Sequence, residues 1–423
     1  FIVYVEVPEE IAQLIEYANQ NGCVIVPTTG GNDLFYEIST SKMDIIVLNM
    51  SLMKKVKDFD MESGYIEVEP GITVGNLNRF FEKNNYNLFF PTMPYGSCDY
   101  TTIAGNIATK TYSKYDFFGG NIGNNLLALN VMDIKGNSFF FGSKTLKNST
   151  GYNLKDMFLG SRGKAGIITS AILKLSLRKE TTFTYFILVE NDKEREIIYQ
   201  FFAADKNEIC YSMVYYSNSA FRGTDFADIL KTTPRCGLFV IELHGFKEDI
   251  EYETNIISGF LKKNNIKFRF VSDKKYYDLQ KLELDAVFLK FQRELNGIFL
   301  KTSFSAENGE ELFKKINSFY DKHDELGRYI FDLNNNMLIY FMPVRNDFNN
   351  KNYEKQINNE DKVEVFRDEF ISSGLLSMIG EGDVGLNGEK YLTKDFIKNS
   401  IYYDLEKDLL NSLKGETCLK QTK

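Results

Sequence analysis

The residues of this chain with the clearest chemistry lie in Pro27–Leu34, which reads PTTGGNDL and follows the apolar run Cys23–Val26. Small side chains in such a loop let several backbone N–H groups converge on a diphosphate, which bulkier side chains would keep away. Two adjacent glycines after a strand are more often an ordinary turn, so this loop alone is a weak signal. Further segments must support it before it predicts a dinucleotide site.

Such segments follow in order along the chain. Four more glycine-containing stretches each stand beside an apolar run, and FPTMP lies among them at Phe90–Pro94; the four are Val68–Leu77, Thr101–Ala108, Thr150–Leu154 and Phe158–Thr169. Five segments of this kind are not expected from unrelated turns. Together they predict a dinucleotide-binding domain in the N-terminal part of the chain.

In this order the segments resemble the PCMH-type FAD-binding domain of the vanillyl-alcohol oxidase superfamily, and within it the glycolate oxidase and D-lactate dehydrogenase branch. The resemblance covers residues 1–178 well and the remainder more loosely. It implies an α+β fold with a two-subdomain PCMH-type FAD-binding domain at 1–178. An α+β cap domain with an antiparallel sheet is then expected at 179–375, and a C-terminal segment returning toward the flavin at 376–423.

The resemblance also implies which residues hold FAD. The first loop would hold the pyrophosphate, the segments near Pro91 and Thr102 would run past the isoalloxazine and ribityl chain, and the last loop would close over the adenine half. The cofactor-binding residues implied in this way are Thr29, Gly30, Gly31, Asn32, Asp33, Pro91, Met93, Thr102, Gly105, Asn106, Gly160, Gly163, Gly166 and Ile168. No histidine lies near these loops, so we expect non-covalent FAD.

The substrate side departs from the branch. Relatives there hold a hydroxy acid with a divalent metal, whereas Phe331, Leu338 and Gly382 stand here where its imidazole ligands are expected. The phenyl ring, the isobutyl group and the hydrogen at these positions have no lone pair that could bind a metal, so we expect no metal site. The substrate-side candidates are Arg293, near the position of a cap arginine in the branch, and Glu381.

The chain contains only two histidines, His244 and His323, and neither falls in a matching motif. We expect each on a strand edge or a solvated helix.

Two functions follow from this resemblance, and a third possibility, loss of flavin altogether, is raised by Thr29 and Ala104 at positions where the family has glycine. The first is an FAD-dependent oxidoreductase that transfers a hydride from a small hydroxy acid or related substrate to flavin N5, with the metal site lost. The second is a non-catalytic flavin-carrying or structural subunit of a multi-subunit oxidoreductase, which the joint loss of three histidines favours. An electron-transfer flavoprotein or an iron–sulfur protein is the expected redox partner.

Composition and net charge limit the partners and the cellular location that we expect for this protein. The 423 residues carry a formal net charge of −8 without a long basic run, which argues against nucleic acid or an anionic membrane as the main partner. The five cysteines are far apart and form no metal-binding pair, so a reducing, cytoplasmic location is expected, with any membrane association through a partner. There is no apolar run of membrane-spanning length. The chain opens directly on an apolar run and is expected to be truncated there.

The pattern of apolar residues predicts the elements that position these loops. Helical spacing runs from Pro8 to Gly22, a hairpin is expected around Glu62–Gly64, and another helix over Val74–Asn84. From Lys179 onward helices alternate with strands, which is typical of an antiparallel α+β domain. We expect the sheet of this second domain to end near Pro343, with a loop at 344–355 and a helix at 366–375.

Overall fold

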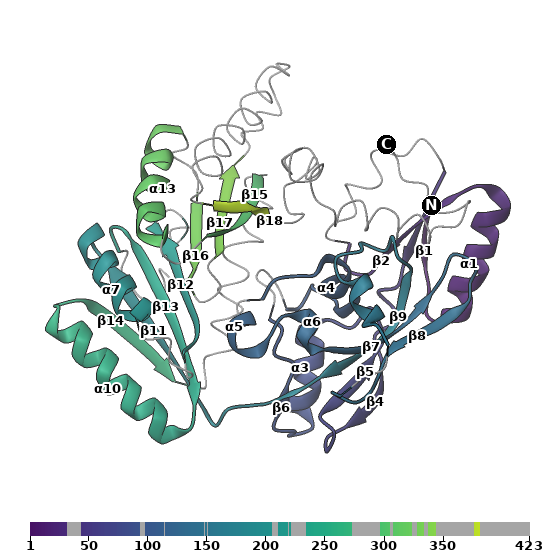
Figure 1. Ribbon diagram of the computed structural model, residues 1–423, viewed down its shortest axis with the longest axis horizontal. Coiled ribbons are helices and arrows are strands. Elements are labelled where there is room, and N and C mark those ends of the chain that lie inside the picture. The colour runs from purple at the N-terminus through teal and green to yellow at the C-terminus, as the bar shows by residue number, and fades with distance from the viewer. Residues whose placement is uncertain are drawn as a thin grey trace. The chain divides into compact units, whose positions relative to one another are not determined.

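The computed structural model describes residues 1–31, 44–93, 98–113, 115–147, 149, 151–204, 210–218, 220, 234–272, 297–304, 308–323, 328–333, 337–343 and 376–380. The chain divides into two compact units (Figure 1), of which the first contains Phe1–Arg178 and the second begins at Lys179. No helix in the described part of the chain is long and apolar enough to cross a membrane.

The first unit starts with a three-stranded parallel sheet in the order β1-β3-β2. Its elements are β1 (Ile2–Tyr4), α1 (Pro8–Asn21), β2 (Val24–Thr28) and β3 (Ile45–Asn49). As the helical spacing predicted, α1 turns Ile11 and Ile15 toward the sheet, where they pack against Leu48. Gly22 ends the helix with a φ of +66°, a conformation that favours glycine. The chain then enters β2 and the first glycine loop.

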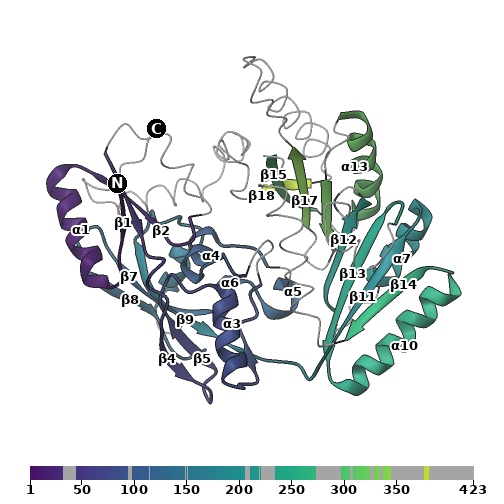
Figure 2. The same cartoon turned by 180° about the vertical axis from the view of Figure 1, so that it is seen from behind.

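A five-stranded antiparallel sheet in the order β4-β5-β9-β7-β8 forms the rest of this unit (Figure 2). Its strands are β4 (Val56–Asp60), β5 (Tyr65–Val68), β7 (Leu126–Met132), β8 (Ser138–Gly142) and β9 (Ile167–Lys174). The other elements of the unit are α3 (Val74–Lys83), α4 (Ile103–Thr109), α5 (Asp116–Gly119), α6 (Ile122–Asn125), the 3₁₀ helix η1 (Leu154–Phe158) and the paired strands β6 (Leu88–Phe89) and β10 (Ser176–Leu177). The expected hairpin is confirmed as β4 and β5.

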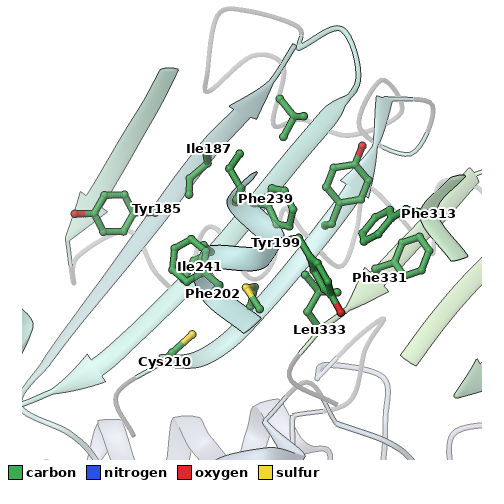
Figure 3. Packing of buried hydrophobic residues seen from close by; sticks show 14 of the residues in the cluster. Tyr185, Ile187, Tyr199, Phe202, Cys210, Phe239, Ile241, Phe313, Phe331 and Leu333 are labelled. Atoms are coloured by element: carbon green, nitrogen blue, oxygen red, sulfur yellow. The ribbon is translucent and has the colours of Figure 1, made fainter. Parts of the chain in front are cut away.

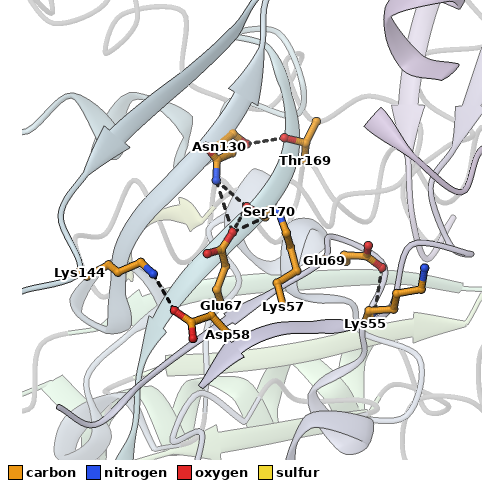
Figure 4. Close-up of polar contacts among 9 residues, drawn as sticks. All are labelled: Lys55, Lys57, Asp58, Glu67, Glu69, Asn130, Lys144, Thr169 and Ser170. Atoms are coloured by element: carbon orange, nitrogen blue, oxygen red, sulfur yellow. Dashed lines mark hydrogen bonds and ion pairs between the residues drawn. The ribbon is translucent and has the colours of Figure 1, made fainter. Parts of the chain in front are cut away.

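A polar network crosses the strands of this sheet (Figure 4). The Glu67 carboxylate on β5 accepts a hydrogen bond of 2.9 Å from the Ser170 hydroxyl on β9 and lies 3.3 Å from Lys57 Nζ. Asn130 on β7 donates its amide to the same hydroxyl at 2.8 Å. Since these partners come from different strands, the network fixes their register and plays a structural role.

The second unit contains an eight-stranded antiparallel sheet in the order β14-β11-β13-β12-β16-β17-β15-β18. The strands are β11 (Thr181–Val189), β12 (Cys210–Ser217), β13 (Gly237–Gly245), β14 (Lys267–Ser272), β15 (Gly297–Phe304), β16 (Arg328–Asp332), β17 (Met337–Pro343) and β18 (Leu376–Gly380). Helices α7 (Asp192–Ala204), α10 (Lys247–Lys263) and α13 (Gly309–His323) supply Ile198, Ile257 and Phe313 to the core of this unit. Figure 3 shows part of this core, with Phe313 beside Phe331.

The expectation that this sheet ends near Pro343 is wrong. Leu376–Gly380 forms β18, which pairs with β15 and adds a further strand. Its residues open the segment 376–423, for which we expected a return toward the flavin, and they extend the sheet of the second unit. The remainder of that segment, the predicted loop at 344–355 and the predicted helix at 366–375 lie outside the described residues.

Candidate dinucleotide-binding site

The first glycine loop leaves the parallel sheet at the carboxyl end of β2. Thr28 still pairs with β3, since its carbonyl accepts a hydrogen bond of 2.9 Å from Met50 N, and Thr29, Gly30 and Gly31 follow. Gly31 has a φ of +74°, which a residue with a Cβ rarely adopts. The carboxyl end of parallel strands is where α/β sheets bind their ligands. Asn32 and Asp33 lie outside the described residues.

The start of α4 meets this loop from another part of the chain. The hydroxyl oxygens of Thr29 and Thr102 lie 2.5 Å apart, although 73 residues separate them in sequence. Thr102 caps the helix, because its hydroxyl also accepts a hydrogen bond of 3.3 Å from Gly105 N. A Cβ added to Gly105 would lie 2.8 Å from Thr102 Oγ1 and 3.7 Å from Thr29 Oγ1. The structure therefore brings together three of the residues singled out in the sequence.

The last glycine loop docks on the far end of the same helix. Gly160 N donates to Ile107 O at 3.0 Å, and Arg162 N donates to Ala108 O at 2.9 Å. Gly163 has a φ of +79°, and a Cβ added there would lie 2.5 Å from Pro27 Cγ, so only glycine allows this loop to approach the end of β2. Three loops far apart in sequence thus converge around α4.

Basic side chains accompany this loop. Arg162 and Lys164 are both partly exposed, so their charges are available to an anion such as a diphosphate.

Gly166 and Ile168 follow this loop and lie beside β7 of the five-stranded sheet. A Cβ added to Gly166 would lie 2.6 Å from Val131 Cγ1, and Ile168 pairs with Val131 across β9 and β7. These two residues therefore anchor the loop to the five-stranded sheet.

The segment Phe90–Met93, which carries the predicted residues Pro91 and Met93, is held by buried polar side chains instead of a sheet ladder. Asn78 Oδ1 accepts a hydrogen bond of 2.8 Å from Phe90 N, and Ser113 Oγ accepts one of 2.7 Å from Met93 N. Asn125 Nδ2 donates to Thr92 Oγ1 at 3.3 Å. We name Asn78, Ser113 and Asn125 the strap anchors.

Sequence reasoning missed all three strap anchors. The one available signal was Asn78, an amide on the apolar face of the predicted helix at 74–84, where Val74, Leu77 and Phe81 are buried. Nothing in the sequence near Ser113 or Asn125 indicates that these side chains reach back to Phe90–Met93.

We predict that Asn78→Leu lowers the free energy of unfolding by about 2–4 kcal/mol, because it leaves the N–H and C=O of Phe90 buried without their amide partner. Denaturant unfolding measures this change. Asn84→Leu is the matched control, since Asn84 lies at the exposed end of the same helix. Equal losses in both variants would contradict the anchoring role of Asn78.

Most of the residues predicted on the substrate side are not among the described residues. Arg293, Glu381 and Gly382 lie outside the described residues, and His323 is the last residue of α13. The expectation for His244 is wrong: it lies on β13, an inner strand, with 7% of its surface exposed. Its ring stacks on Tyr211 with centroids 4.2 Å apart, and its Nε2 lies 3.6 Å from the Glu242 carboxylate. Glu242 and His244 alternate with apolar residues, a pattern typical of a half-exposed strand. Only the strand order shows that β13 is an inner strand.

Phe331, one of the expected imidazole positions, lies in the core beneath α13. It is fully buried, and its ring centroid lies 4.1 Å from that of Phe313 and 5.7 Å from that of Phe304. Leu338 is its register partner on β17. Within the described ranges no three His, Cys, Asp or Glu side chains are grouped so that they could hold a metal ion.

Asn106 tests whether the converging loops fit a dinucleotide. Its side chain is fully buried on α4, and neither amide atom has a hydrogen-bond partner among the described residues. Buried polar groups are nearly always paired, so this amide indicates a partner from outside the chain. At Gly105 and Gly163 a Cβ would clash with the neighbouring loop, so only glycine allows the loops to converge. The unpaired amide and these two glycines fit the binding of a dinucleotide.

Comparison with protein families gives the same assignment for this region. Residues 1–140 match the family model of an FAD binding domain. A mitochondrial D-2-hydroxyglutarate dehydrogenase of Arabidopsis thaliana is 30% identical over 161 residues, which cover 38% of this chain and 28% of that protein. The glycolate oxidase subunit GlcD of Bacillus subtilis is 27% identical over 61% of this chain and 54% of its own length. The alignments thus span from about a quarter to about half of these relatives.

Solved structures share the fold over nearly the whole chain. The 4-ethylphenol oxidase of Gulosibacter chungangensis has a TM-score of 0.72 at 14% identity and covers 98% of this chain and 86% of its own. A p-cresol methylhydroxylase has a TM-score of 0.71 at 16% identity, covering 97% of this chain and 86% of its own. At these identities the similarity concerns the fold, and it confirms the α+β architecture expected from the sequence.

Proposed function

Because this chain belongs to the vanillyl-alcohol oxidase superfamily of flavoproteins and carries its PCMH-type FAD-binding domain, we propose that it is an FAD-linked oxidoreductase acting on a small hydroxy acid. The convergence of the Thr29, Thr102 and Gly163 segments around α4 carries this proposal. The relatives named above, a D-2-hydroxyglutarate dehydrogenase and a glycolate oxidase subunit, support the substrate class.

The residues of this chain bind and orient the cofactor in this proposal. Bound FAD supplies the hydride acceptor, N5 of its isoalloxazine. The backbone of Thr29–Gly31 would hold the pyrophosphate, and Arg162 and Lys164 would add positive charge from the docked loop. The strap anchors fix Phe90 and Met93 on either side of Pro91, and this segment would lie beside the ring. Non-covalent binding fits a set of loops that contains no histidine.

We further propose that the reaction proceeds without the divalent metal used by the branch. Phe331 packs under α13, and Leu338 and Gly382 likewise offer no lone pair at the remaining ligand positions. A metal that polarises the substrate hydroxyl is worth several kcal/mol at the transition state. The reaction is therefore expected to be slow, and the reduced flavin to pass electrons to a partner of the electron-transfer flavoprotein or iron–sulfur class.

The test is anaerobic reduction of the FAD-loaded protein by D-2-hydroxyglutarate, D-lactate and glycolate. We predict that one of them bleaches the visible flavin absorption and that a chelator leaves the rate unchanged. Reduction abolished by the chelator and restored by zinc or manganese would contradict the loss of the metal site. Stoichiometric FAD that none of these acids reduces would instead favour a flavin-carrying subunit without catalytic activity.

A further inference from the structure

Asn106 differs from the other buried asparagines of the first unit. Asn78 and Asn125 are 3% and 2% exposed, and each amide is paired within the chain. Asn106 is 0% exposed, yet its Nδ2 and Oδ1 have no partner among the described residues. Its backbone is fully used, since its N–H donates to Thr102 O and its carbonyl accepts from Thr111 N. The helix is therefore well formed, and only the side-chain amide is left over.

The neighbouring hydroxyls are already paired with other groups of the chain. Thr29 and Thr102 share a hydrogen bond with each other, and Thr109 donates its hydroxyl to Gly105 O at 2.8 Å. An unpaired buried amide reduces stability, whereas an apolar side chain of the same shape would not. Asn106 is thus unfavourable in the free protein and becomes favourable only when a ligand pairs with it.

The two unpaired atoms restrict what that ligand can be. A carboxamide offers hydrogens at Nδ2 and lone pairs at Oδ1, so its complement must both accept and donate. A phosphate at neutral pH accepts hydrogen bonds and would leave Oδ1 unpaired. A flavin ring edge, with a carbonyl beside an N–H, and an adenine edge, with a ring nitrogen beside an amino group, each satisfy both atoms.

We propose that Asn106 recognises a paired donor and acceptor on a ring edge of FAD and does not bind its pyrophosphate. The inference rests on the proposed FAD binding and adds to it the part of FAD with which one residue forms hydrogen bonds. In this arrangement the backbone of the glycine loops binds the diphosphate, while Asn106 distinguishes a ring with the correct hydrogen-bonding edge. The residue therefore contributes to selection of the cofactor.

Asn106→Leu tests the proposal through two effects of opposite sign. In the cofactor-free protein the variant should be at least as stable as the wild type in thermal unfolding, because the unpaired amide is gone. Its affinity for FAD, measured by titration calorimetry, should fall about ten- to a hundredfold, as expected for one or two lost hydrogen bonds. Asn125→Leu is the matched control: its amide is paired, so its cofactor-free form should be less stable.

Riboflavin and ADP then separate the two rings. Weaker riboflavin binding with unchanged ADP binding would assign Asn106 to the isoalloxazine, and the reverse would assign it to adenine. Unchanged binding of both, or equal losses of both, would overturn the proposal. So would a less stable cofactor-free Asn106→Leu or an unchanged FAD affinity, since the amide would then have a structural partner or a bound water. A wild-type protein that binds no FAD would instead refute the proposed function itself.

Discussion

Gly30→Val is expected to lose FAD while the protein stays folded. Gly30 is exposed in the loop that follows β2, directly before Gly31 with its φ of +74°. A branched side chain here would stand where backbone N–H groups must approach a diphosphate. Steric exclusion removes the whole phosphate contact, so we expect FAD affinity to fall by about two orders of magnitude or more.

Titration of the purified variant with FAD measures this loss, and thermal unfolding reports whether the fold survives. Gly259→Val on α10 is the matched control, because a Cβ added there meets no atom within 4 Å. It should bind FAD as the wild type does. Stoichiometric FAD retained by Gly30→Val would show that the diphosphate lies elsewhere.

The second large effect is expected in the other unit. Phe331→Ala should lower the free energy of unfolding by about 3–5 kcal/mol, the usual cost of removing a buried phenylalanine side chain. Phe331 is fully buried and packs on Phe304 and Phe313, so the cavity lies between the sheet and α13. Urea unfolding measures the change.

Phe270→Ala provides the comparison, since Phe270 lies on edge strand β14 with 60% of its surface exposed. It should cost far less than Phe331→Ala. A stable Phe331→Ala variant would place the side chain outside the core and reopen its position as part of a substrate site.

The first unit was the more predictable from sequence. Its helices and loops carry glycines whose conformational needs are local, as at Gly22 and Gly31 with φ of +66° and +74°. The residues that fix Phe90–Met93 could not be predicted, because Asn125 reaches Thr92 across 33 residues of sequence. Such pairs depend on the tertiary fold, and an isolated asparagine gives no sign of its partner.

In the second unit, burial of whole strands makes the pattern of apolar and polar residues a poor guide to which residues are exposed. Every described residue of β12 and β13 is buried, so the alternation of Ile241, Glu242, Leu243 and His244 does not mark a half-exposed strand here. His244 could not be placed for this reason. β18 joins the sheet from a distant part of the sequence, and no local pattern predicts such a pairing.

The visible absorption spectrum of the purified protein, followed by acid precipitation, tests the central claim most directly. We predict a yellow protein whose released flavin is FAD and not FMN, because the converging loops of the first unit are suited to a dinucleotide. A colourless protein that also fails to take up added FAD would contradict the account.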